Sequence, residues 1–133
     1  MQLYTQKDNI AVMGLHVRDF PLGIREAFDH LKYTFGNYRT YYGISWMDEH
    51  DHVQYYAMTP EIFDGEALEY YYKILAIDSG EYITETIQDW QTKTATIKDV
   101  FHHLMPDKKP CENHPCIEWY KSDHEMVCMV KAR

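Results

Sequence analysis

The sequence predicts one α+β domain, built as a curved antiparallel sheet with two helices on one face and a groove for a ligand. The chain has 133 residues, which suits a single domain with a proper core. Hydrophobic residues make up 45% of it, so a disordered chain is excluded. The order strand, helix, strand, strand occurs twice, at about 9–59 and 70–131. Two such units are expected to share one sheet.

The first unit shows the pattern most clearly. A β-rich run is followed by Asp19-Phe20-Pro21, a helix start with Asp19 as the expected N-cap. Apolar residues then recur at steps of three and four from Ile24 to Phe35, and Gly36 is expected to end the helix. The expected elements are a strand at 9–18, a helix at 19–35, and strands at 43–46 and 53–59.

A connection rich in turn residues, about 60–69, leads into the second unit. The segment from Met1 to Asn9 is polar, lacks the apolar core of a signal peptide and belongs to the single domain expected over 1–133. The elements expected in the second unit are strands at 70–77 and 81–87, a helix at 95–105, a loop at 106–115, and strands at 116–120 and 126–130.

Charge and composition exclude several classes of function. The formal net charge is −8, so binding to a nucleic-acid backbone is not expected, whereas cationic ligands are favoured. No apolar run reaches the roughly 18 residues of a membrane span, and neither a signal peptide nor a DNA-binding helix is expected before the domain. Three cysteines favour a reduced, cytoplasmic protein over a disulfide framework.

The expected strands are apolar on both faces, whereas an antiparallel sheet with one solvated face carries polar residues on that face. On the strand at 116–120, the two-residue period turns Ile117 and Trp119 to one face, and Glu118 and Tyr120 to the other. Aromatic residues are 15% of the chain. We expect this excess on the face that the helices leave open, with Glu118 among it, so that a ligand or a partner covers that face.

Glu118 is the main candidate for a functional residue. A carboxylate among apolar side chains costs several kcal/mol unless it is paired or protonated. It would act as counter-charge for a flat, hydrophobic cation held by aromatic rings. The alternative is a solvent-facing glutamate on an edge strand, paired with Lys121 or Lys131. The candidate ligand-binding residues are Trp46, Tyr55, Trp90, Glu118 and Tyr120.

A metal site and a nucleophilic cysteine are weaker interpretations. Cys111, His114 and Cys116 have zinc-ligand side chains, but the spacing differs from standard zinc motifs and a fourth ligand would have to come from Cys128 or His124. The pairs His50–His52 and His102–His103 are explained more simply by a turn and a helix end. Buried cysteines are mostly core residues, so neither a metal nor another cofactor is expected.

Several segments together resemble the GyrI-like small-molecule-binding domain, which is also the effector-binding domain of AraC-type and MerR-type multidrug regulators. Pro115-Cys116-Ile117-Glu118-Trp119-Tyr120 is similar to the family's "Pro-Cys-Phe-Glu-x-Tyr", and Ile77-Asp78-Ser79-Gly80-Glu81-Tyr82 to its "Pro-Ala-Gly-Lys-Tyr" turn. Ser79 and Met129 depart from the usual Ala and Pro, and Trp46 and Asp89-Trp90 are not family features. The other similar segments are 12–17, 20–28, 42–45, 55–57 and 129–131.

The resemblance implies a duplicated strand-helix-strand-strand fold in which Glu118 meets cationic lipophilic drugs beside Tyr120. The first expectation is therefore a stand-alone binding protein, a monomer or homodimer, that senses or sequesters such compounds. Because some stand-alone members hydrolyse cyclopropanoid genotoxins, the second expectation is a hydrolase in which Glu118 activates water. The third is a transcriptional co-regulator that binds a partner protein and has no DNA-binding domain of its own.

Overall fold

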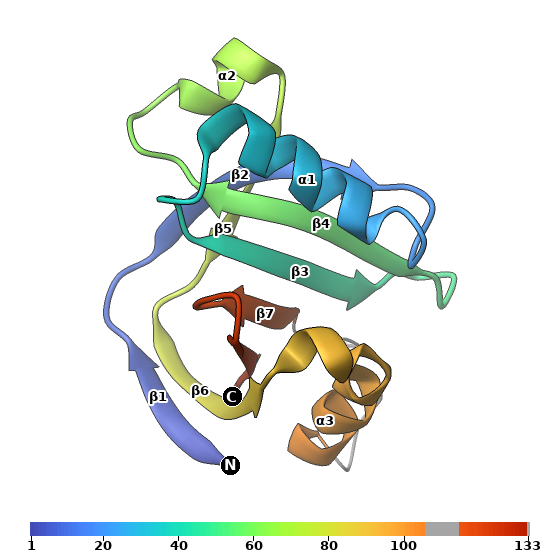
Figure 1. The fold of residues 1–133 in the computed structure, drawn as a ribbon. Helices are drawn as coiled ribbons and strands as arrows, with labels where there is room; N and C mark the ends of the chain where they lie inside the picture. The colour runs from blue at the N-terminus through green and yellow to red at the C-terminus, as the bar shows by residue number, and fades with distance from the viewer. Residues whose placement is uncertain (106–114, 133) are drawn as a thin grey trace.

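The computed structural model describes residues 1–105 and 115–132 and contains one eight-stranded antiparallel sheet. The order of the strands across the sheet is β1-β6-β8-β7-β3-β4-β2-β5 (Figure 1). The strands are β1 (Gln2–Gln6), β2 (Ile10–Val17), β3 (Tyr41–Met47), β4 (Val53–Pro60), β5 (Lys73–Ile77), β6 (Gly80–Gln88), β7 (Cys116–Tyr120) and β8 (Glu125–Lys131). The helices are α1 (Ile24–Phe35), α2 (Glu66–Tyr70) and α3 (Ile97–Leu104), with 3-10 turns η1 (Trp90–Thr92) and η2 (Thr94–Thr96).

The predicted duplication is present in the order of the elements. The first unit is β2-α1-β3-β4 and the second is β6-α3-β7-β8. The two units meet where β3 pairs with β7, which places Gly43 opposite Glu118 and Tyr41 opposite Tyr120. The centre of the sheet is therefore built from one strand of each unit.

Three local features differ from the sequence prediction. The N-terminal segment, for which the sequence predicts no strand, forms β1, an edge strand paired with β6. The helix α2 forms inside the expected connection, after Gly65 adopts the left-handed conformation with φ of +91°. The helix α1 begins at Ile24, because the chain from Asp19 first makes a turn in which the Gly23 amide donates to the Asp19 carbonyl. It ends at Gly36, as predicted.

Both long helices lie on the same face of the sheet. The apolar side of α1 packs on β2 and β4 through Phe28 and Leu31, and that of α3 packs on β6 and β8 through Phe101 and Leu104. Figure 1 shows the two helices over different parts of the sheet. The central strands β3 and β7 therefore form the floor of a groove between α1 and α3.

The opposite face encloses its own core because the sheet is curled. Side chains from β2 to β8 meet there, and Tyr4 of the edge strand β1 reaches Trp119 with 5.8 Å between ring centres. The largest buried members are Tyr42, Tyr82, Ile44, Met58, Ile77, Ile117 and Met129. The curl thus closes the face without helices, whereas on the other face Glu118 and Tyr120 stay half-buried between the parts that α1 and α3 cover.

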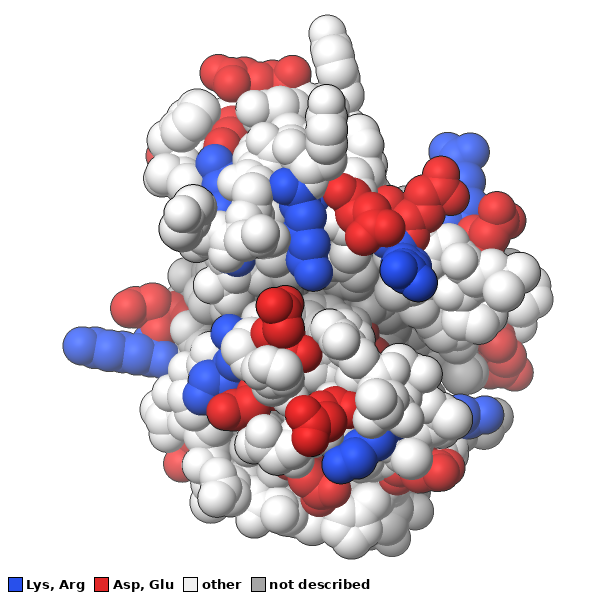
Figure 2. All heavy atoms as spheres, viewed as in Figure 1, with Lys and Arg blue, Asp and Glu red and all other residues white. Residues whose placement is uncertain are grey.

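The surface carries both signs of charge close together. Figure 2 shows acidic and basic side chains scattered over both halves of the visible face, with no broad field of a single sign. Selection of a charged ligand would therefore depend on groups inside the groove. Among the described residues, no helix has the length and apolar character needed to cross a membrane.

Candidate functional site

Glu118 lies in the middle of the sheet, at the floor of the groove. Its strand, β7, lies between β3 and β8, and Glu118 is opposite Gly43 on one side and Cys128 on the other. We expected this residue on the face without helices, and the structure places it on the helix face. The reason is that α1 packs mainly on β2 and β4 and α3 mainly on β6 and β8, whereas the curl closes the other face.

Two tyrosine hydroxyls converge on one oxygen of the Glu118 carboxylate. Tyr120, on the same strand, donates to Oε1 at 2.6 Å, and Tyr55, from β4, donates to the same oxygen. The two hydroxyl oxygens lie 3.3 Å apart. Since β3 separates β4 from β7, the Tyr55 side chain must pass over β3 to reach Glu118.

Gly43 makes this crossing possible. A Cβ atom on Gly43 would overlap both the Tyr55 hydroxyl and the Glu118 carboxylate. Any other residue would therefore push the two groups apart. The sequence prediction missed Gly43, although a glycine inside a strand is a known sign that another group approaches the backbone closely.

The second carboxylate oxygen of Glu118, Oε2, has different surroundings from Oε1. No described residue donates a hydrogen bond to it, and no buried side-chain oxygen or nitrogen of the described residues is without a partner. Oε2 is therefore accessible to solvent, in agreement with the half-buried state of Glu118. Among the same residues, no lysine, arginine or histidine forms an ion pair with it.

The surroundings of this cluster raise the pKa of each of its titratable groups. Burial raises the pKa of Glu118, and the hydrogen bonds from Tyr120 and Tyr55 only partly offset that rise. Burial, followed by the charge of Glu118, raises the pKa of Tyr55 and of Tyr120 well above the ordinary tyrosine value. Both hydroxyls thus stay protonated as donors. Burial and Glu118 also raise the pKa of the Cys128 thiol, which makes it a poor nucleophile.

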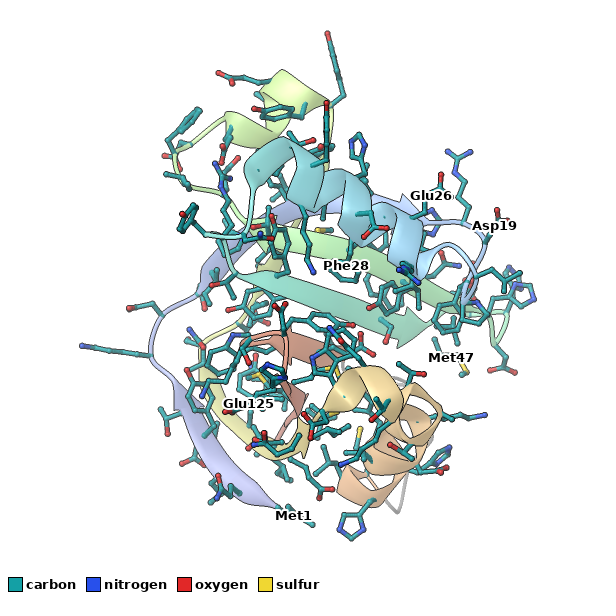
Figure 3. The ribbon with its side chains drawn as sticks, in the orientation of Figure 1. Met1, Asp19, Glu26, Phe28, Met47 and Glu125 are labelled. Carbon is teal, nitrogen blue, oxygen red and sulfur yellow. The ribbon has the colours of Figure 1, made fainter. Side chains whose placement is uncertain are left out.

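Aromatic rings surround the cluster from both units. Phe28 of α1 and Trp90 of η1 each place a ring edge against Tyr120, with ring centres 5.0 Å apart. Figure 3 shows Phe28 between α1 and the sheet. Phe20 stacks on Tyr55 at 5.6 Å and is 41% exposed, so its outer part is open to a ligand. Phe20 and Phe28 were not predicted as site residues, because in sequence they look like ordinary helix-start and core residues.

Of the five candidate residues, the structure brings four together: Tyr55, Trp90, Glu118 and Tyr120. Trp46 lies elsewhere. It is on the opposite face of β3 from Gly43, and its ring stacks on Tyr56 at 5.2 Å with an interplanar angle of 11°. Trp46 therefore does not share a face with Glu118.

The structure also shows where the lysines and cysteines of the alternative interpretations lie. Lys131 lies 3.9 Å from Asp78, and Lys121 lies over the ring of Trp119, so neither lysine pairs with Glu118. Cys111 and His114 lie outside the described residues. Cys116 is disulfide-bonded, contrary to the expected reduced state, and so is not a free thiolate ligand.

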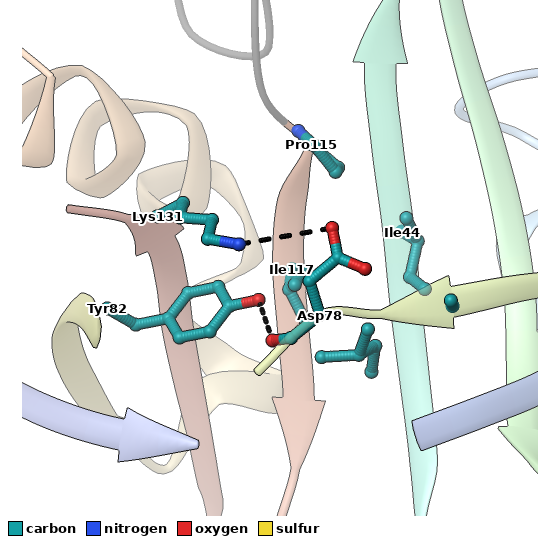
Figure 4. A pocket seen from close by; sticks show the side chains of 8 residues that line it. Ile44, Asp78, Tyr82, Pro115, Ile117 and Lys131 are labelled. Atoms are coloured by element: carbon teal, nitrogen blue, oxygen red, sulfur yellow. Dashed lines mark hydrogen bonds and ion pairs between the residues drawn. The ribbon is translucent and has the colours of Figure 1, made fainter. Parts of the chain in front are cut away.

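A small pocket lies on the other face of the sheet (Figure 4). Its polar groups satisfy one another, because the Tyr82 hydroxyl donates to the Asp78 carbonyl at 2.6 Å and Lys131 pairs with the Asp78 carboxylate. Its apolar lining includes Ile44, Ile77 and Ile117. We assign no ligand to this pocket.

Solved structures share this architecture. Comparison with protein-family models gave no match, and comparison with curated proteins gave none. A structure of SAV2435 bound to tetraphenylphosphonium superposes with a TM-score of 0.65 at 13% identity, covering 97% of this chain and 91% of that one. A putative bacterial transcription regulation protein from Staphylococcus aureus MU50 gives 0.59 at 16%, covering 98% and 97%. A hydrolase from Listeria innocua gives 0.54 at 12%, covering 97% and 89%. At these identities the likeness shows a shared fold.

Proposed function

We propose that this chain forms a GyrI-like domain that binds bulky, hydrophobic aromatic cations in the groove between α1 and α3. The observation that carries the proposal is Glu118, a half-buried carboxylate near aromatic rings. Within residues 1–105 and 115–132, one of its oxygens has no hydrogen-bond donor and no cation pairs with it. The fold shared with SAV2435, which was solved with tetraphenylphosphonium, supports the proposal.

The physical reason is charge compensation. An ionised carboxylate away from water costs several kcal/mol unless it is paired. A cation that enters the groove would pair with Oε2 of Glu118 and lose little hydration if its charge is shielded by aromatic groups. Each aromatic ring near the cation adds about 0.5–2 kcal/mol of cation–π attraction. Phe20 and Trp90, which are not fully buried, are placed to provide this contact.

Calorimetric titration with tetraphenylphosphonium tests the proposal. Glu118→Gln keeps the shape and the hydrogen bonds from the tyrosines but removes the charge, so binding should weaken by about 1–3 kcal/mol. The matched control is Glu81→Gln, which changes the net charge equally at an exposed position of β6 and should leave binding unchanged. Circular dichroism confirms that both variants are folded.

Tetraphenylborate provides the second control, because it has nearly the same shape and the opposite charge. It should bind far more weakly than tetraphenylphosphonium. Equal affinity of the two ions, or equal affinity of the Glu118→Gln variant and the original protein for the phosphonium, would refute the proposal. Hydrolysis of an electrophilic ligand through Glu118 stays a prediction that the geometry does not favour over binding.

A further inference from the structure

The two oxygens of Glu118 differ in their surroundings, which determines where a proton would lie. Oε1 already accepts two hydrogen bonds, from Tyr55 and Tyr120. A proton on Oε1 would displace one of these donors and exchange a hydrogen bond to the carboxylate for the longer one between the two tyrosine hydroxyls, 3.3 Å apart. A proton on Oε2 displaces nothing, because no described residue donates to that oxygen. The protonated form of Glu118 therefore carries its O–H on the side that faces the groove.

The described groups that face Glu118 are all uncharged, so none of them holds Glu118 in either its ionised or its protonated form. They are the hydroxyls of Tyr55 from β4 and Tyr120 from β7, and the thiol of Cys128 from β8. Gly43 of β3 has no side chain, and α1 and η1 contribute the uncharged rings of Phe28 and Trp90. The pKa of Glu118 is raised by its burial, so the neutral acid is populated at higher pH than for an exposed glutamate.

We infer that the groove also takes a second class of ligand, neutral aromatic molecules with a strong hydrogen-bond acceptor oxygen, which the Oε2–H of protonated Glu118 would bind. This inference rests on the proposed function, because it uses the same aromatic walls. The two ligand classes then respond to pH in opposite directions. A bound cation favours the ionised carboxylate of Glu118, so its binding releases a proton from Glu118. A neutral acceptor needs the protonated acid of Glu118, so its binding keeps that proton bound.

Triphenylphosphine oxide is a suitable probe, since it resembles tetraphenylphosphonium in size but is neutral and ends in an acceptor oxygen. Both ligands would be titrated into the protein at a series of pH values, from the ordinary glutamate pKa upward through the raised pKa of Glu118. Affinity for the phosphonium should rise with pH, by up to about tenfold per pH unit below the pKa of Glu118. Affinity for the oxide should fall over the same range.

The variant Glu118→Gln separates the two classes most sharply. Its amide oxygen can accept from Tyr55 and Tyr120 while its NH₂ group faces the groove as a permanent donor. The variant should bind the oxide at every pH in the range, and should bind the phosphonium weakly and without pH dependence. Glu81→Gln, the exposed control, should behave like the original protein with both ligands.

The outcomes distinguish this inference from the proposed function. If neither ligand binds, the proposed function fails and this inference fails with it. If the phosphonium binds through Glu118 but the oxide does not bind, or binds without pH dependence, the proposed function stands and this inference is wrong. Loss of oxide binding in a folded Glu118→Gln variant would also overturn it, because the amide preserves the donor.

Discussion

Two carboxylates in this protein, one buried and one half-buried, have opposite surroundings. Glu66, at the start of α2, is 3% exposed and accepts two hydrogen bonds from Arg39, at 3.0 and 2.8 Å, and a third from the Ile62 amide at 3.0 Å. The Arg39 hydrogen bonds, the largest favourable cause, lower the pKa of Glu66. Glu118 accepts only from two neutral hydroxyls, and burial raises its pKa.

The difference shows that the partner, and not burial alone, decides what a buried carboxylate does. The fold provides a cation for Glu66, so this pair serves to hold α2 against the chain before β3. Because its pKa is lowered, the stability that Glu66 contributes is lost as the pH falls through the lowered value. Glu118 has a raised pKa, so its ionised form costs stability as the pH rises from the ordinary glutamate value through the raised one. A ligand cation would remove that cost.

The largest expected effect comes from removing the cation at Glu66. Arg39→Ala leaves a carboxylate buried without its partner and should lower the free energy of unfolding by about 3 kcal/mol. Urea denaturation measures this loss, with Arg25→Ala on the exposed side of α1 as control. Glu118→Gln should cause no comparable loss, since it removes a charge that the protein leaves unpaired. If Arg39→Ala lowers the free energy of unfolding no more than Arg25→Ala does, the contrast between Glu66 and Glu118 is wrong.

A smaller effect is expected at Gly43. The added Cβ of Gly43→Ala would overlap the Tyr55 hydroxyl and the Glu118 carboxylate, and overpacking of this kind costs about 1–3 kcal/mol. Binding of tetraphenylphosphonium should weaken at the same time. Adding Tyr55→Phe removes the hydroxyl that the Cβ meets and should restore part of the stability. If the double variant unfolds as easily as the single one, Gly43 is needed for some other reason.

The sequence predicted much of the site but not the face it occupies. The two-residue strand period placed Glu118 and Tyr120 on one face, and aromatic composition indicated Tyr55 and Trp90. The sequence did not show that Trp46 lies on the other face from Glu118. The strand register that pairs Gly43 with Glu118 is not encoded locally, and Trp46, three residues after Gly43, points to the opposite face. The open face was assigned wrongly, since the curl of the sheet depends on contacts such as that between Tyr4 and Trp119, which join distant segments.

The most direct test of the account is the pKa of Glu118, measured from its carboxyl carbon by NMR with and without tetraphenylphosphonium. Without the ligand, the pKa should lie above the ordinary glutamate value, because no cation compensates the buried charge. With the ligand bound, it should fall, since a cation near Oε2 stabilises the carboxylate. Glu66 serves as internal reference and should titrate at the same low pH in both samples. A pKa of Glu118 that is not raised, or that the bound ligand leaves unchanged, would contradict the claim that the ligand supplies the missing cation.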